Sequence, residues 1–179
     1  EMGQLQEELE AVNADLKRAR DRVEASARLD PLTAALNRRA FAAVLADQNR
    51  TGFGLMRGVV VVVDLDDLKL LNDTYGHAAG DAALQGLADA LRSCLEGDDL
   101  LFRWGGDEFV LILRGATLAH AEARFDGFNE KLRAKAIPGA ADPIDLRASV
   151  GLSEFVDAST LDQAIARADQ MSNWFLMNE

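Results

Sequence analysis

Five consecutive valines at positions 59–63 constrain the fold of this 179-residue chain more than any other segment. β-branched residues favour strands, and an apolar run without polar alternation needs cover on both faces of its sheet. The segment from Gly58 to Leu65 therefore predicts a buried strand. It runs into the sequence Asp64-Leu65-Asp66-Asp67-Leu68-Lys69, so carboxylates are expected where this strand ends.

A second acidic cluster lies about forty residues further on, in Arg103-Trp104-Gly105-Gly106-Asp107-Glu108-Phe109. A Gly-Gly pair between two short apolar runs, here 100–104 and 108–113, indicates a hairpin. Carboxylates from two neighbouring strands form a site for hard divalent cations, which prefer oxygen ligands. Such a site suits phosphoryl chemistry, because the metal ions neutralise charge on the transferring oxygens.

The rest of the chain predicts a mixed architecture. We expect helices after Asp30-Pro31, over 66–75, from Asp81 to about 96 and over 118–136, a strand within 144–156, and a last helix opened by a capping box at 159–162. A βαββαβ core follows from this order. The predicted class is α+β, with a central, mostly antiparallel, ferredoxin-like sheet flanked by helices. The strand at 58–65 would lie centrally beside the Gly-Gly hairpin and bring Asp64 close to Asp107.

Residues 1–29 differ from the remainder, and residues 30–179 are expected to form one globular domain. Apolar or small residues recur at alternating spacings of three and four, at Met2, Leu5, Leu9, Val12, Leu16, Ala19, Val23 and Ser26. This heptad predicts a coiled coil, and hence a homodimer. The alternative is an amphipathic helix packed on its own domain, which the 3.5-residue period and the narrow stripe disfavour.

Composition excludes several classes of partner. The formal net charge is −11, and Cys94 is the single cysteine. The negative charge argues against binding to nucleic acid and against direct contact with an anionic membrane. One cysteine excludes an intrachain disulfide and a cysteine-based zinc site. We expect a cytoplasmic location, because no long apolar segment or signal peptide is found, and a sensory domain upstream of Glu1.

Five ordered motifs together resemble the GGDEF domain of diguanylate cyclases, a nucleotidyl cyclase domain with a palm-like core. The residues that carry the resemblance are Asp30-Pro31-Leu32-Thr33 with Leu36-Asn37-Arg38; Asp64-Leu65-Asp66, Lys69, Asn72-Asp73, Gly76-His77 and Gly80-Asp81; Arg103 with Gly105 to Phe109; Ser149-Val150-Gly151; and Ala168-Asp169. The resemblance covers the chain from Asp30 to about Asp169.

The resemblance implies a diguanylate cyclase that condenses two GTP molecules into cyclic di-GMP and two pyrophosphates across a dimer. Asp64, Asp107 and the Leu65 carbonyl would hold two Mg²⁺ or Mn²⁺ ions per active site. Glu108 would act as a metal ligand or a base. Asn72 and Asp81 would bind guanine, Lys69 would contact phosphate, and Gly105-Gly106 would let the backbone approach phosphate.

Two departures from the family pattern bear on activity. Glu96 replaces the arginine of the family's Arg-x-x-Asp product-inhibition motif, although Asp99 is retained, so no allosteric product site is expected. Leu176 stands where a phosphate-binding lysine is expected. The alternative functions are therefore a degenerate domain that binds GTP or a partner with little turnover, and a purely structural coiled-coil module. Asp66 and Asp67 are interpreted as a helix start rather than as metal ligands.

Overall fold

The computed structural model describes residues 2–51, 57–133 and 144–175. Within them, five strands form one sheet in the order β1-β3-β4-β2-β5. The strands are β1 (Leu36–Asn37), β2 (Gly58–Leu65), β3 (Leu100–Arg103), β4 (Glu108–Arg114) and β5 (Ala148–Phe155). The four strands β2 to β5 are paired antiparallel, and only β1 joins β3 in parallel. The predicted central position of β2 beside the hairpin is confirmed.

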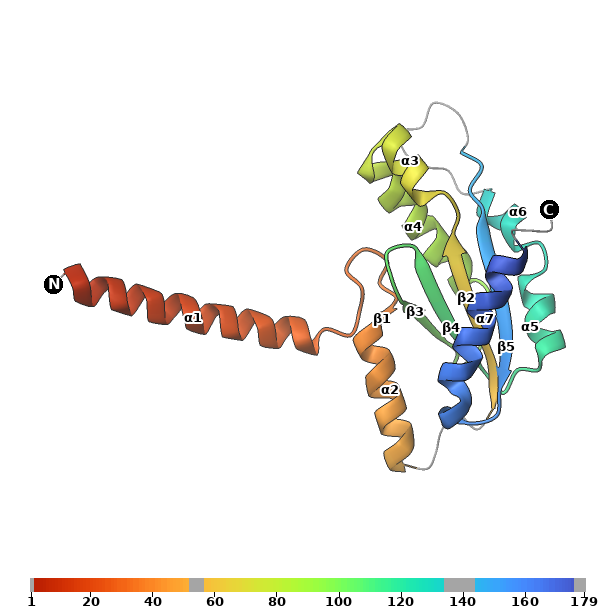
Figure 1. Ribbon diagram of the computed structural model, residues 1–179, viewed down its shortest axis with the longest axis horizontal. Coiled ribbons are helices and arrows are strands. Elements are labelled where there is room, and N and C mark those ends of the chain that lie inside the picture. Colours follow the sequence, from red (N-terminus) through yellow and green to blue (C-terminus); the bar gives the residue numbers. More distant parts are fainter. Residues whose placement is uncertain (1, 52–56, 134–143, 176–179) are drawn as a thin grey trace.

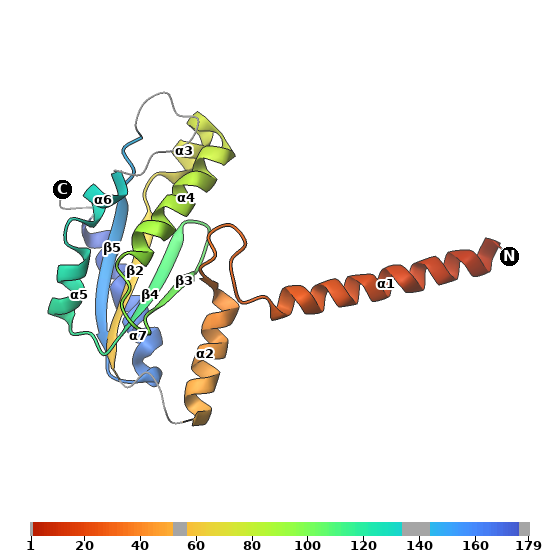
Figure 2. The same ribbon diagram turned by 180° about the vertical axis from the view of Figure 1, so that it is seen from behind.

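Helices cover both faces of the sheet (Figures 1 and 2). The core helices α4 (His77–Arg92), α5 (Leu118–Phe125) and α6 (Phe128–Arg133) belong to one face, and α2 (Arg38–Thr51) and α7 (Leu161–Phe175) to the other. The valine run supplies both layers, because Val59, Val61 and Val63 enter the first core cluster and Val60 and Val62 the second. All five valines are fully buried, which explains why the run shows no polar alternation.

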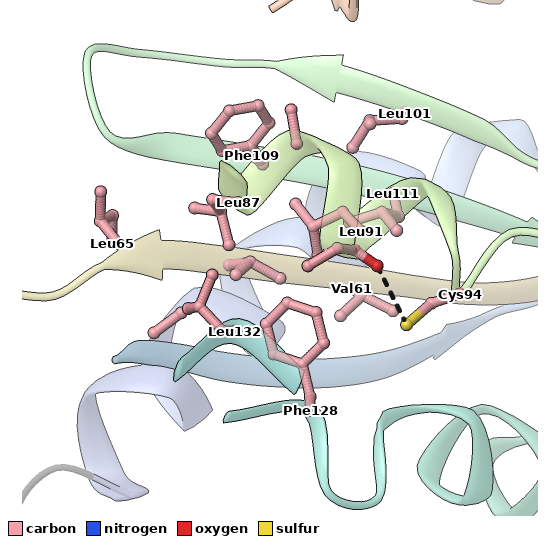
Figure 3. Packing of buried hydrophobic residues seen from close by; sticks show 14 of the residues in the cluster. Val61, Leu65, Leu87, Leu91, Cys94, Leu101, Phe109, Leu111, Phe128 and Leu132 are labelled. Atoms are coloured by element: carbon pink, nitrogen blue, oxygen red, sulfur yellow. Dashed lines mark hydrogen bonds between the residues drawn. The ribbon is translucent and has the colours of Figure 1, made fainter. Parts of the chain in front are cut away.

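The first core cluster joins α4 to the middle of the sheet. Leu87 and Leu91 of α4 project toward Val61 and Leu111, and Phe128 and Leu132 close the layer from the α6 side (Figure 3). Cys94 belongs to this cluster, and its thiol donates to the Ala90 carbonyl at 3.6 Å. Its role is packing, as the sequence suggests.

The helix α1 (Met2–Ser26) extends away from the sheet (Figure 1). Three of its heptad residues, Val12, Leu16 and Val23, are 63%, 67% and 69% exposed in the single chain. No helix in the described part of the chain combines the length and apolarity needed to cross a membrane.

The segment after the stalk differs from the prediction. The helix expected after Asp30-Pro31 begins only at Arg38, because residues 31–33 form a turn and Ala34 adopts a left-handed backbone with φ 55°. Asp30 stabilises this turn instead of a helix start, since its carboxylate accepts hydrogen bonds from the Thr33 amide at 2.8 Å and from the Thr33 hydroxyl at 2.7 Å. The N-cap of α2 is Asn37, whose Oδ1 accepts the Ala40 amide at 3.0 Å.

The boundaries of four further helices also differ from the predicted ones. The helix α3 spans Leu68–Tyr75, and α4 begins at His77 rather than Asp81, because the break is Gly76 alone with φ 86°. The helix expected over 118–136 is divided into α5 and α6 at Asp126-Gly127, where Gly127 has φ 64°.

The start of α7 is likewise built differently from the predicted capping box. A 3₁₀ turn, η1 (Ala158–Thr160), precedes α7, and Asp157 accepts the Thr160 amide at 3.0 Å. Asp157, rather than Ser159, therefore organises this turn.

Candidate active site

The two acidic clusters meet across neighbouring strands. Asp64, near the end of β2, is the register partner of Glu108, the first residue of β4. Directly opposed residues of antiparallel strands place their side chains on the same face about 4.5–5.5 Å apart at Cβ. That face is the one covered by α2 and α7, because Val60 and Val62 of β2 belong to the second core cluster.

Asp107 is brought to the same place by the hairpin. The Leu65 amide donates to the Asp107 carbonyl at 3.1 Å, which ties the end of β2 to the loop. The Trp104 and Gly105 amides both donate to the Glu108 carbonyl, at 2.8 and 3.2 Å, and close the turn. The expectation that Asp64 and Asp107 lie near each other agrees with this pairing.

The two loop glycines leave the surface open. A Cβ on Gly106 would have no protein atom within 4 Å, and one on Gly105 would only reach ordinary contact with Glu108 at 3.6 Å. Neither glycine has a positive φ. Neither the backbone conformation nor a neighbouring residue in the described chain requires glycine at these two positions. The pair is therefore better explained by a ligand that approaches the loop closely.

Arg103 anchors this loop to the base of the stalk. Its guanidinium donates to the Gly106 carbonyl at 2.7 Å and to the Asp30 carboxylate at 3.0 Å. Both side chains of the ion pair are largely buried, at 15% and 17% exposure. Burial alone would raise the pKa of Asp30, but hydrogen bonds from Thr33 and the Arg103 guanidinium lower it overall.

The carboxylates are electrostatically strained. Burial, followed by the charges of Asp107 and Glu108, raises the pKa of Asp64 to about 6. Burial and the charges of Asp169 and Asp107 raise the pKa of Glu108 as well, against an opposing effect of Arg38. A cluster of half-buried like charges with raised pKa values is typical of a functional site and favours a bound cation.

Asp169 is a member of the cluster for which the sequence analysis predicted no chemical role. It lies on α7, and its charge raises the pKa of both Asp64 and Glu108. The available signal was the Ala168-Asp169 motif on a helix whose buried face, Ala164 and Ala168, packs on the same side of the sheet.

The interpretation of Asp66 and Asp67 as a helix start is only partly right. Asp67 occupies the N-cap position of α3, but its backbone is left-handed (φ 56°) and its side chain makes no capping hydrogen bond. Asp66 instead accepts a hydrogen bond from the Ser149 hydroxyl of β5 at 2.7 Å.

The donor chemistry fits a divalent cation, although the ligands are not gathered around one. Asp64, Asp107 and Glu108 offer hard oxygen donors next to a loop without side-chain obstruction. Among the residues that the structure describes, no group of three His, Cys, Asp or Glu side chains is arranged closely enough to enclose a metal ion. The mutual repulsion of these carboxylates, which contributes to the raised pKa of Asp64 and of Glu108, would be offset by a bound cation.

The residues expected to bind guanine meet between α3 and α4. Asn72 has a buried Oδ1 without a hydrogen-bond partner in the described chain. Gly80 faces it so closely that a Cβ there would lie 1.9 Å from this oxygen. Asp81 and Lys69 are exposed nearby on α4 and α3. An unpaired buried acceptor is rare and indicates a missing donor.

The Glu96–Asp99 segment is occupied internally. Asp99 accepts the Glu96 amide at 2.9 Å, the Arg114 amide at 2.8 Å and the Arg124 guanidinium. Glu96 lies 3.8 Å from the same guanidinium. Asp99 therefore holds the turn before β3 together, whatever else it binds. Leu176 lies outside the described residues.

A cavity of about 800 Å³ lies away from the acidic cluster, between the α5–α6 segment and β5. Its lining includes Phe125, Phe128, Val150 and Leu152, and near the end of β2 it includes Asp66 and Ser149. We assign the chemistry to the carboxylates rather than to this cavity, because the perturbed pKa values lie with the former.

The ferredoxin-like sheet, together with the carboxylates at the ends of β2 and β4, defines a GGDEF-type domain. The family model described as "Diguanylate cyclase, GGDEF domain" matches residues 27–173. The chain belongs to this family.

Named relatives agree with this assignment. The chain is 37% identical over 150 residues to diguanylate cyclase DosC of Escherichia coli, covering 79% of this chain and 31% of that protein. It is 31% identical over 154 residues to diguanylate cyclase DgcM of the same species, covering 86% of this chain and 37% of that protein. The chain thus spans about a third of the length of these relatives.

Solved structures match as well. Diguanylate cyclase SiaD of Pseudomonas aeruginosa, solved in complex with its activator SiaC, superposes with a TM-score of 0.72 at 31% identity, covering 96% of this chain and 65% of that one. The coiled coil and GGDEF domain of DgcB from Caulobacter crescentus, in complex with c-di-GMP, gives a TM-score of 0.71 at 22% identity, covering 94% and 92% of the two chains. At that identity the likeness concerns the fold.

Proposed function

We propose that this chain is the catalytic part of a diguanylate cyclase, acting in the cytoplasm, which condenses two GTP molecules into cyclic di-GMP and two pyrophosphates. The observation that carries the proposal is the pairing of Asp64 with Glu108 across β2 and β4, beside the open Gly105–Gly106 loop. Asp64, Asp107 and the Leu65 carbonyl would hold two Mg²⁺ or Mn²⁺ ions. Ions held there would supply positive charge against the phosphate oxygens and would make the attacking 3′-hydroxyl more acidic.

Different residues of the protein would bind the metal ions, the phosphates and the guanine base. The carboxylates fix the ions, and the bare glycine loop admits the phosphates without a Cβ in the way. The exposed Asp81 and the side chain of Asn72 would offer acceptors to the guanine N1–H and N2–H₂ groups, and the unpaired Asn72 Oδ1, which lies buried against Gly80, would turn toward the base. Adenine lacks these two donors, so it would leave the acceptors unpaired.

A second copy of the chain is needed, because each 3′-hydroxyl attacks the α-phosphate held by the opposite domain. We infer that α1 pairs with its counterpart in a coiled coil. The exposed Val12, Leu16 and Val23 at heptad spacing support this pairing. The stalk would raise the effective concentration of one half-site for the other and connect it to an upstream sensory domain.

The decisive experiment is turnover with GTP and Mg²⁺. We expect cyclic di-GMP from the wild-type chain and none from Asp64→Ala or Asp107→Ala, with both variants folded because each relieves repulsion among carboxylates. Measurable product from both variants would refute the two-metal assignment. Bound GTP without any product in the wild type would instead favour a degenerate, nucleotide-binding module, which the leucine at position 176 suggests.

A further inference from the structure

A cation is held at the edge of the acidic cluster by an aromatic stack. The guanidinium of Arg38, the first residue of α2, lies 4.8 Å from the centroid of the Trp104 ring. Trp104 in turn packs edge-on against Phe41, with ring centroids 4.8 Å apart and planes at 89°. Phe41 is only 4% exposed, so the stack rests on the core. Arg38 itself is exposed.

The fold places this arginine beside the catalytic hairpin. β1 and β3 are parallel and pair Asn37 with Arg103, so the next residues along the two strands are Arg38 and Trp104. Trp104 immediately precedes the glycine loop, and its amide donates to the Glu108 carbonyl at 2.8 Å. Arg38 therefore occupies the side of the loop that faces α2 and α7, where Asp64, Glu108 and Asp169 also lie.

The stack preorganises a charge that forms no ion pair with any residue that the structure describes. None of the ion pairs in the described residues involves Arg38, whereas Arg103 and Arg124 are each engaged with carboxylates. A guanidinium stacked on an indole keeps its N–H edges free and loses little side-chain entropy when it binds. Its edges suit bidentate contact with phosphate oxygens.

The electrostatic balance of the site calls for such a cation. Two divalent ions would only offset the four carboxylates Asp64, Asp107, Glu108 and Asp169. A nucleotide triphosphate then adds further negative charge that no group in that cluster opposes. Lys69, the other cation assigned to phosphate, lies on α3 rather than on α2.

We propose that Arg38 is a nucleotide-binding residue, whose guanidinium, held over Trp104, contacts the β- and γ-phosphates of GTP at the mouth of the acidic cluster. This inference rests on the proposed function, since it assigns a further residue to the same site. It also assigns a phosphate-binding cation to α2. This matters because a leucine stands at position 176, where a phosphate-binding lysine is expected.

The test is equilibrium binding of 3′-deoxyguanosine triphosphate with Mg²⁺ to the full chain, because this analogue lacks the attacking hydroxyl and cannot turn over. We expect Arg38→Ala to weaken its binding about tenfold and to leave the affinity for GMP unchanged. Arg38→Lys keeps the charge but loses the planar guanidinium. Its affinity for the analogue should therefore lie between that of the wild type and that of Arg38→Ala. The matched control is Arg39→Ala, which makes the same charge change one residue further along α2.

The possible results separate the inference from the function. If the wild type binds the analogue and Arg38→Ala binds it equally well, the inference fails while the proposed function stands. An equal loss of triphosphate and GMP affinity in Arg38→Ala, or an equal effect of Arg39→Ala, would also overturn it. If the wild type binds neither nucleotide and forms no product from GTP, the proposed function itself fails.

Discussion

At the scale of single residues, the site combines groups that are costly to bury with neighbours that do not satisfy them. Asp64 is surrounded by other carboxylates, and Asn72 presents an oxygen without a donor. Each of these features lowers the stability of the protein without ligands, and under the proposed function each would be relieved by a component of metal-bound GTP. Their effects on stability and on binding should therefore be separable by substitution.

Asp64→Asn should stabilise the metal-free protein at pH 7.5. The folded-state pKa of Asp64 is raised to about 6 from an ordinary value of 3.8, so the folded protein binds more protons than the unfolded chain between these values. The wild type should therefore gain stability as pH falls through 6, and its deficit against the variant should be lost below about pH 4. Thermal melting in EDTA across this range measures the effect. Added Mg²⁺ should raise the melting temperature of the wild type at pH 7.5 but not that of the variant; the opposite ranking would contradict the assignment.

Gly80→Ala should impair guanine recognition. The new Cβ would lie 1.9 Å from Asn72 Oδ1 and would force that side chain to rotate. We expect GTP affinity to fall about tenfold and selectivity over ATP to shrink, because the acceptor no longer faces guanine. Isothermal titration with both nucleotides measures this. The double variant with Asn72→Ala should be no worse than Asn72→Ala alone, and full additivity would show that the two residues act separately.

At the scale of elements, the β3–β4 hairpin is the part on which the site depends most. It is paired to β2 along one side, closed by Glu108, and linked through Arg103 to Asp30 at the foot of the stalk. The turn that leads into it is held by Asp99 and Arg124. That turn is also where the family's product-binding arginine is replaced.

Glu96→Arg should create inhibition by cyclic di-GMP. In the wild type, Asp99 already forms an ion pair with the Arg124 guanidinium, and the Glu96 carboxylate adds a further negative charge 3.8 Å from it, so we expect no tight product binding there. The substitution would remove that charge and place a second guanidinium beside Arg124, which suits a cyclic dinucleotide's phosphates. Titrating cyclic di-GMP during turnover of both proteins measures the difference. Strong inhibition of the wild type through this surface would contradict the prediction. Asp99→Ala is a poor control, because Asp99 also holds the turn.

The sequence predicted the elements with strong local patterns and missed those set by distant contacts. The valine run and the Gly-Gly pair identified β2 and the hairpin. Burial on both faces and turn formation each require particular residues within a short segment, so both can be recognised in the sequence. The two-residue β1 has no pattern of its own and exists only by pairing with β3. The break at Asp126-Gly127 was not predicted, because the apolar residues on either side of it keep a helical spacing. One helix was therefore predicted where two occur. Asp169 and Arg38 join the site through tertiary packing, which residue spacing does not reveal.

At the scale of the whole molecule, α1 projects from a domain that holds one acidic cluster. Its exposed apolar residues have no cover within the described part of a single chain. The domain alone, in contrast, has two core layers that include strands and helices from its full length. Folding and assembly should therefore be separable.

Deleting residues 1–28 should leave a folded monomer at micromolar concentration whose specific activity rises steeply with protein concentration. The half-sites would then meet only by diffusion. Size-exclusion chromatography and a concentration series measure both effects. In the intact chain, Leu16→Glu should act in the same direction, while Ala14→Glu, outside the heptad positions, serves as the matched control. Undiminished, concentration-independent activity of the truncated protein would show that the stalk does not join the half-sites.

The layer formed by α2 and α7 has a consequence for biosynthesis. α2 is the first helix after the stalk and α7 is the last described helix, yet both cover the same face, which carries Asp64 and Glu108. A ribosome emits α2 long before α7, so the nascent chain holds a partly uncovered valine face until α7 has emerged. The acidic cluster likewise gains Asp169 only with α7. A nascent chain from which α7 has not yet emerged therefore lacks a complete acidic cluster.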